Sequence, residues 1–175
     1  LFPYTTLFRS GSCNVNGSFS RNESHLLSQS QSVNSISRSW SVGGKISGSP
    51  CRWLSFDYAI DFSNSQLMMN SVANSWLSQM TNELNLTFIP HRKWQWTVCG
   101  EHYRNEITEG TFKNAVIIDT KLTYLLSKKI ELSASLTNIL DKRSYNYTTY
   151  SVLSSFESQR QLRGRQLLFS ITLRK

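Results

Sequence analysis

The sequence predicts an all-β fold: an antiparallel up-and-down transmembrane β-barrel of which this chain supplies one part. Apolar residues alternate with polar ones along most of the chain, as they do on strands with two different faces. Several of the alternating runs reach about 11 residues, the length that a tilted strand needs to cross a bilayer. Short connections alternate with long polar ones, as they do in outer-membrane barrels.

The first ten residues, "LFPYTTLFRS", are excluded from this fold. Leu1–Ser10 matches the conceptual translation of a short-read sequencing adapter at every position, and it fits no targeting signal. We therefore expect residues 1–10 to be an adapter-derived artefact. We expect residues 11–175 to be the C-terminal portion of the barrel domain of a longer protein, without its plug domain.

Period-two alternation predicts eight strands. In "CRWLSFDYAIDF" the even positions from 54 to 62 are apolar, and most of the odd positions between them are polar. The even-numbered stripe recurs within 84–98 and 116–136, and the odd positions of 167–173 continue it. Strands separate the two sets onto opposite faces, whereas a helix would mix them. The expected strands are 12–20, 33–48, 52–63, 79–89, 94–105, 114–126, 130–140 and 164–173.

Three tight reversals join neighbouring strands and set their registers. We place their centres at Pro50, His91 and Lys128. These centres bring apolar residues opposite one another, namely Val42 and Tyr58, Phe88 and Trp94, and Tyr124 and Leu132. The other connections are long and polar: 21–32, 63–77, 106–113 and 141–163. In a barrel, the short turns would be periplasmic and the long loops extracellular.

The two faces of the predicted strands differ in chemistry. The apolar stripe carries the aromatic residues expected of a membrane girdle: Trp94, Trp96, Tyr124 and Phe169. The opposite face carries the charges Asp57, Asp61, Glu83, Glu101, Asp119, Lys121 and Glu131. Two residues are irregular. Arg38 lies on the apolar side, so either it is near the extracellular interface or the register is wrong, and Trp53 falls on the polar face. A soluble sandwich would also place a polar face in water.

Charge and composition exclude several classes of function. The formal net charge is +8, but the cations are scattered over turns and loops, so we expect no nucleic-acid partner. The three cysteines and three histidines are isolated and lack the spacing of metal ligands. No nucleophile elbow or phosphate-binding loop occurs. We therefore expect no enzyme activity, metal or cofactor. No run of eighteen apolar residues indicates a transmembrane helix.

The last third of the chain resembles a known family. "ELSASLTNILDKRSYNY" and "RQLRGRQLLFSITLRK" are similar to the C-terminal end of TonB-dependent receptors and related outer-membrane β-barrel proteins. The motif positions are Asn138, Ile139, Leu140 and Asp141, followed by Arg163, Gly164 and Arg165. Two features depart from the family pattern, because leucine replaces the usual phenylalanine at position 140 and the chain does not end on an aromatic residue.

The resemblance implies a barrel of about 22 strands around an N-terminal plug, in the outer membrane of a Gram-negative bacterium. It implies uptake of a scarce or bulky nutrient, such as a siderophore or glycan, with energy from TonB. The implied partners are outer-membrane lipid, the TonB complex through the missing N-terminal part, the barrel-assembly machinery and, in part of the family, a surface lipoprotein. Loop 141–163 holds our candidates for ligand contact, Arg143, Tyr145, Tyr147, Tyr150 and Arg160. The alternative, which most loop residues follow, is that they only solvate and stabilise the outer rim.

Two alternatives remain open at this point. The chain could be a small complete eight-stranded barrel with a structural or adhesive role. Closure would then pair the first strand, near Cys13 and Phe19, with residues 167–173, although that first strand is short and poorly apolar. The chain could also be a soluble β-domain with a binding face, which the alternation of short and long connections disfavours.

Overall fold

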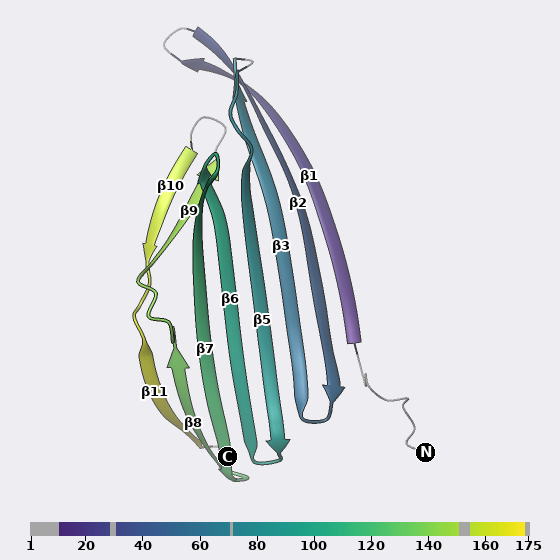
Figure 1. Ribbon diagram of the computed structural model, residues 1–175, viewed down its shortest axis with the longest axis vertical. Coiled ribbons are helices and arrows are strands. Elements are labelled where there is room, and N and C mark those ends of the chain that lie inside the picture. The colour runs from purple at the N-terminus through teal and green to yellow at the C-terminus, as the bar shows by residue number, and fades with distance from the viewer. Residues whose placement is uncertain (1–10, 29–30, 71, 151–154, 174–175) are drawn as a thin grey trace.

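The computed structural model describes residues 11–28, 31–70, 72–150 and 155–173, and these residues form an all-β structure (Figure 1). Leu1–Ser10, the expected artefact, lies outside the described residues. In the described ranges, no helix is long and apolar enough to span a membrane. Antiparallel pairing joins the main strands into one nine-stranded sheet, and two further strands form a separate hairpin.

All eight expected strands are present and pair in the expected order. They are β1 (Gly11–Ser28), β2 (Gln31–Cys51), β3 (Leu54–Met69), β5 (Leu77–His91), β6 (Trp94–Thr108), β7 (Thr111–Ser127), β8 (Ile130–Thr137) and β11 (Gln166–Leu173). The structure adds the short β4 (Val72–Ala73), which pairs with β3, and the hairpin of β9 (Ser144–Tyr150) and β10 (Ser155–Gln161). The sheet is not closed, since β1 and β11 are its edges and lie at opposite margins in Figure 1.

Two of the expected long connections are wrong, because most of their residues extend the strands. The pairing of β1 with β2 continues to Ser28 and Gln31, and that of β6 with β7 continues to Thr108 and Thr111. Backbone pairing needs no apolar side chain, so serine- and asparagine-rich segments can prolong a ladder after the alternation has ended. The expected connection 63–77 is shortened, because β3 continues to Met69 and the two residues of β4 follow. The fourth expected connection, 141–163, contains the β9–β10 hairpin.

A buried glutamate fixes the tight turn that replaces the expected loop after β6. The carboxylate of Glu106 accepts hydrogen bonds from the backbone N–H of Ser78 at 3.1 Å, from its hydroxyl at 2.7 Å, and from the N–H of Gly110 at 2.8 Å. Gly110 has a φ of 73°, which glycine adopts without steric cost. The carboxylate therefore joins the start of β5 to the β6–β7 turn.

The register expected after β7 is confirmed, and the register expected after β5 is wrong by two residues. Tyr124 pairs with Leu132 as expected. Phe88 pairs with Trp96 rather than with Trp94, because the ladder is irregular between Phe88 and His91. The displacement is even, so every side chain keeps its expected face although its partner changes.

The register expected after β2 is wrong by four residues. Val42 pairs with Phe62 rather than with Tyr58, and the turn is formed by residues 52–53 rather than around Pro50. The ladder shifts between Gly48 and Cys51, next to the proline. Proline cannot donate a ladder hydrogen bond, which explains why it lies in an irregular part of the strand.

The sheet has an apolar face and a polar face, and two ends. We call the end with the turns at 52–53, 92–93 and 128–129 the turn end, and the opposite end the loop end. The buried apolar residues lie at the loop end of the polar face, where Leu67 is 2% exposed and Leu77 is 3% exposed. Ala115 of β7 is also buried there. β9 contacts β3 and β6, so the hairpin lies beside this small core.

Candidate functional site

The apolar face is exposed over nearly its whole width. It consists of the even-numbered residues of β2, β3 and β5 to β8 and the odd-numbered residues of β1 and β11, as the registers require. Among the described residues, its exposed large apolar side chains include Val15, Phe19, Val42, Ile46, Ile60, Leu84, Trp94, Trp96, Phe112, Leu122, Leu126, Leu167, Phe169, Ile171 and Leu173. Soluble monomers rarely expose a continuous apolar patch of this extent.

The apolar residues form a band that crosses the sheet diagonally. From Phe169 of β11, the row of directly paired residues runs across successive strands through Ala134, Leu122, Trp96, Phe88 and Leu54. On β2 this row meets Cys51, the last residue of that strand at the turn end. On β1 the apolar run occupies 13–19, nearer the loop end. Its middle residue, Asn16, pairs with Gly43, which lies eight residues from Cys51 along β2. A shift of about eight residues over the seven steps from β11 to β1, at ~3.3 Å per residue and ~4.8 Å per strand, corresponds to an angle of about 38°. Strands of transmembrane barrels are tilted by about 35–45°.

The four predicted girdle aromatics all lie on the apolar face. Near the turn end, the rings of Trp94 and Tyr124 are 4.4 Å apart, and those of Phe88 and Trp96 are 5.3 Å apart. Phe169, on the edge strand, is 76% exposed. Four of these rings, those of Phe88, Trp94, Trp96 and Tyr124, therefore cluster near the turn end of the apolar face.

The sequence-based placement of Trp53 on the polar face is wrong. Trp53 is a turn residue, and its ring stacks at 6.4 Å on Phe88, which belongs to the apolar face. The backbone carbonyl of Trp53 also accepts a hydrogen bond from the N–H of Ile89 at 2.7 Å. The turn residue is free of the strict alternation of a strand, so Trp53 joins the aromatic cluster.

Polar and cationic residues replace the apolar ones toward the loop end of the same face. Asn82 accepts a hydrogen bond from the Tyr58 hydroxyl at 2.9 Å, and its amide nitrogen lies 3.1 Å from Nδ1 of His102. The guanidinium of Arg104 lies 4.2 Å from the ring centre of Phe112. Arg38 lies at this margin too, so its position on the apolar side is as expected.

The polar face is crowded with hydrophilic side chains. A Cβ atom added to Gly43 would meet the carboxylate of Asp61, and would approach the side-chain oxygen of Asn16 to 2.6 Å. Lys45 and Asp57 form a half-exposed ion pair at 3.9 Å. Glycine at 43 therefore makes room for polar side chains of the two neighbouring strands.

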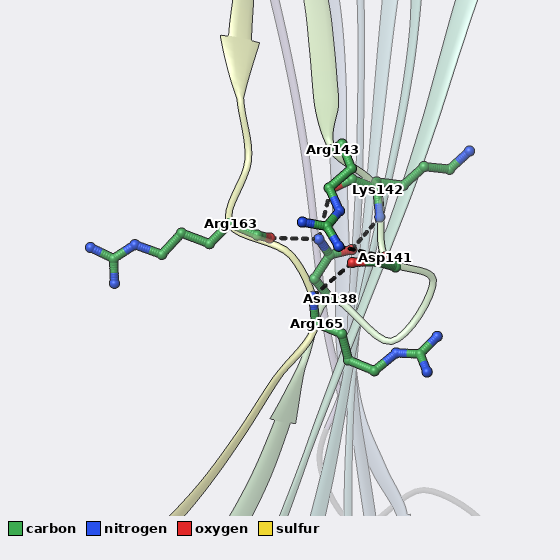
Figure 2. A network of polar contacts seen from close by, with 6 residues as sticks. All are labelled: Asn138, Asp141, Lys142, Arg143, Arg163 and Arg165. Atoms are coloured by element: carbon green, nitrogen blue, oxygen red, sulfur yellow. Dashed lines mark hydrogen bonds and ion pairs between the residues drawn. The ribbon is translucent and has the colours of Figure 1, made fainter.

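The motif residues meet in a polar clamp where β8 ends and β11 begins (Figure 2). Asn138 is buried and has a φ of 50°. Its amide nitrogen donates to the carbonyls of Lys142 at 2.7 Å and Arg163 at 2.8 Å, and its side-chain oxygen accepts from the N–H of Lys142 at 2.9 Å. The Asn138 N–H donates to Asp119 of β7 at 2.7 Å. The Asn138 side chain thus joins the segment before β9 to the segment after β10.

Asp141 closes the second half of the clamp. Its carboxylate accepts hydrogen bonds from the backbone N–H of Arg165 at 2.9 Å and from the guanidinium of Arg143 at 3.0 Å. These two donors, the Arg165 N–H first, lower the pKa of the Asp141 carboxyl from its ordinary value. A Cβ atom at Gly164 would lie 2.7 Å from the Arg143 guanidinium and 2.9 Å from the Asp141 carboxylate. The two remaining motif residues contribute little to the clamp, since Ile139 binds the Ile118 carbonyl through its N–H and Leu140 is exposed.

The candidate ligand residues fall on the hairpin and its base. In β9 and β10, Tyr145 pairs with Arg160, Tyr147 with Ser158, and Tyr150 with Ser155. The side chains of Tyr145, Tyr147, Tyr150 and Arg160 lie outside the described part of the structure, so their role stays a prediction. Arg143 is described, and its guanidinium is engaged with Asp141 although most of the side chain is exposed.

A hollow beside the hairpin could receive a polar group. It is lined by Phe112, Lys113, Asn114, Ala115, Lys142, Arg143, Ser144 and Gln159. Three of these side chains are cationic, and the carboxylate of Asp141 is paired with one of them. The sequence gives no sign that Lys113 and Lys142 are neighbours, because the fold, and not their spacing, brings the start of β7 to the base of β9.

Comparison of this chain with protein-family models, with curated proteins and with solved structures found no match. Within the described ranges, no group of three or more histidine, cysteine, aspartate or glutamate side chains is placed to hold a metal ion. The apolar face and the clamp are therefore the features on which a functional proposal must rest.

Proposed function

We propose that the chain is part of the wall of a transmembrane β-barrel in the outer membrane of a Gram-negative bacterium. The diagonal apolar band carries this proposal, because its angle of about 38° is the one that tilted strands need to keep a lipid-facing band level. The polar face then lines the barrel interior, and the loop end is extracellular. Outer-membrane lipid is the first partner, and the barrel-assembly machinery inserts the strands.

We propose further that the intact barrel is a TonB-dependent receptor that takes up a scarce or bulky nutrient such as a siderophore or glycan. The convergence of the 138–141 and 163–165 motif residues supports this, because the resemblance rests on them. The cationic hollow beside Lys142 and Arg143 offers a place for a polar group of the nutrient at the extracellular end. Energy comes from the TonB complex through a preceding plug domain, and a surface lipoprotein is an optional partner.

Sequencing the source DNA upstream of the Gly11 codon tests the transport proposal. We would amplify it with a primer placed within the codons for residues 94–100, so that the product crosses the junction with residues 1–10. The proposal predicts several hundred further codons that encode a plug-like domain and more strands of about 10 residues. A signal peptide directly before Gly11 would contradict transport and favour the small structural or adhesive barrel.

A further inference from the structure

Two arginines face each other at the loop-end margin of the apolar face. Arg21 of β1 and Arg38 of β2 are directly paired in the ladder and lie on the same face. Like charges in directly opposed positions destabilise a sheet unless something compensates them. Within the described part of the chain, Arg21 forms a loose ion pair with Glu23 at 3.7 Å. Among the described residues, no ion pair engages Arg38, whose neighbour on β3 is the uncharged Gln66.

Apolar and aromatic side chains lie directly below this arginine pair. The next row of the apolar face toward the turn end holds Phe19 and Trp40, which are paired with each other. The Trp40 ring lies 5.3 Å from that of Phe62, and Phe19 is 70% exposed. Val15 and Val42 continue the apolar surface toward the turn end. Two adjacent cations above a bare apolar surface match one kind of molecule, a lipid with a phosphate in its head group.

We propose that Arg21 and Arg38 together bind the phosphate of an anionic lipid in the loop-side leaflet, while its acyl chains lie on Phe19 and Trp40. Charge complementarity argues for this occupant, because the phosphate would relieve the repulsion between the two guanidinium groups, each of which can bind phosphate oxygens through two N–H donors. The inference rests on the proposed membrane position of the band. It adds a specific lipid site to what would otherwise be a non-selective surface.

Tryptophan quenching by brominated lipids tests the site, because Trp40 lies next to Arg38. In the full chain, Trp53, Trp76, Trp94 and Trp96 are changed to phenylalanine, and the folded chain is placed in vesicles that contain brominated phosphatidylcholine or brominated phosphatidylglycerol. We expect stronger quenching of Trp40 by the anionic lipid. Each of the substitutions Arg21→Gln and Arg38→Gln should weaken the preference about fivefold, the usual contribution of one cation near a membrane surface.

The matched control is Lys45→Gln, which removes one positive charge from the same strand β2 but from its polar face. It should leave the preference unchanged, and an equal loss in Lys45→Gln and Arg38→Gln would overturn the site in favour of net charge. Equal quenching of Trp40 by both lipids would also overturn it, while leaving the membrane position intact. Absence of quenching by either lipid would contradict the proposed membrane position itself.

A second measurement uses the chain with all its tryptophans, in case the phenylalanine variants do not fold. Flotation with vesicles of phosphatidylcholine alone, or mixed with phosphatidylglycerol, gives the preference for the anionic lipid directly. We expect Arg21→Gln/Arg38→Gln to lose this preference and Lys45→Gln to keep it. Inorganic phosphate added to the mixture should not displace the chain from anionic vesicles, since the acyl chains contribute to binding; displacement would overturn the assignment to a lipid.

Discussion

Asn138 and Asp141 both adopt the left-handed backbone conformation, which explains why the motif at the end of β8 has asparagine and aspartate at these positions. Asparagine and aspartate are the non-glycine residues that adopt positive φ most readily, and both can hydrogen-bond nearby backbone groups. Sequence alone could predict a turn at 138–141. It could not predict that the Asn138 amide reaches Arg163, because that contact joins residues on either side of the hairpin. The motif therefore has a structural role that requires no ligand.

Gly164→Ala should loosen the clamp, because the new methyl group would overlap the Arg143 guanidinium and the Asp141 carboxylate. We expect a loss of about 1 kcal/mol in the free energy of unfolding, at the low end for overpacking, since the Arg143 side chain can swing away. Urea titration of the chain in detergent micelles measures it. Gly100→Ala is the control, because nothing lies within 4 Å of its added Cβ. Arg143→Ala in the same chain should restore part of the loss, and an undiminished loss would contradict the contact.

The clamp should weaken in acid through Asp141. Its pKa is lowered in the folded chain, so its contribution to stability is present above the unfolded pKa of about 4 and is lost as the pH falls through the lowered value. We expect wild type to be more stable than Asp141→Asn near neutral pH, and this difference to shrink below about pH 4. Urea unfolding at several pH values measures the difference. A difference that does not change with pH would show that the carboxylate charge is not involved.

At the scale of strands and turns, the sequence predicts the sheet face of a side chain better than it predicts the cross-strand partner of a residue. Alternation assigned Leu122 and Phe169 to one face and Asp119 to the other, and an even shift of register leaves such assignments unchanged. Partners were wrong beside Pro50 and His91, where irregular ladders move the turn by one or two residues. Polar segments that merely extend a ladder carry no alternation, so their strands were read as loops.

A cross-strand disulfide distinguishes the observed register of β5 and β6 from the one expected from the sequence. Cys99 pairs with Asn85 in the structure, whereas a turn centred at His91 would place it opposite Glu83. With Cys13 and Cys51 changed to serine, we expect Asn85→Cys to form a disulfide with Cys99 on mild oxidation. Glu83→Cys should not, because diagonal neighbours are about 7–8 Å apart, beyond disulfide reach. Peptide mass mapping checks both, and the reverse result would contradict the register.

At the scale of the whole molecule, the described chain is an open wall with two unpaired edges (Figure 1). One of its faces is apolar and exposed. The sequence could predict that an apolar stripe exists, because each strand carries its own alternation. It could not predict the diagonal course of the band, which depends on how far each strand is displaced against the next. That displacement is known only once pairings such as Phe169 with Ala134 and Val15 with Gly44 are fixed.

The most direct test of a lipid-facing band is to measure the environment of the two faces of β7 in a bilayer. The cysteines of the chain are replaced by serine, and each labelled chain is reconstituted in phosphatidylcholine vesicles. Single nitroxide labels at Ile118 and Leu122, on the apolar face, are compared with labels at Lys121 and Thr123, on the polar face. If the band faces lipid, oxygen, which partitions into lipid, should relax the first pair of labels more strongly, and a water-soluble nickel chelate should relax the second pair more strongly. Equal access of the nickel chelate to all four positions would contradict a lipid-facing band.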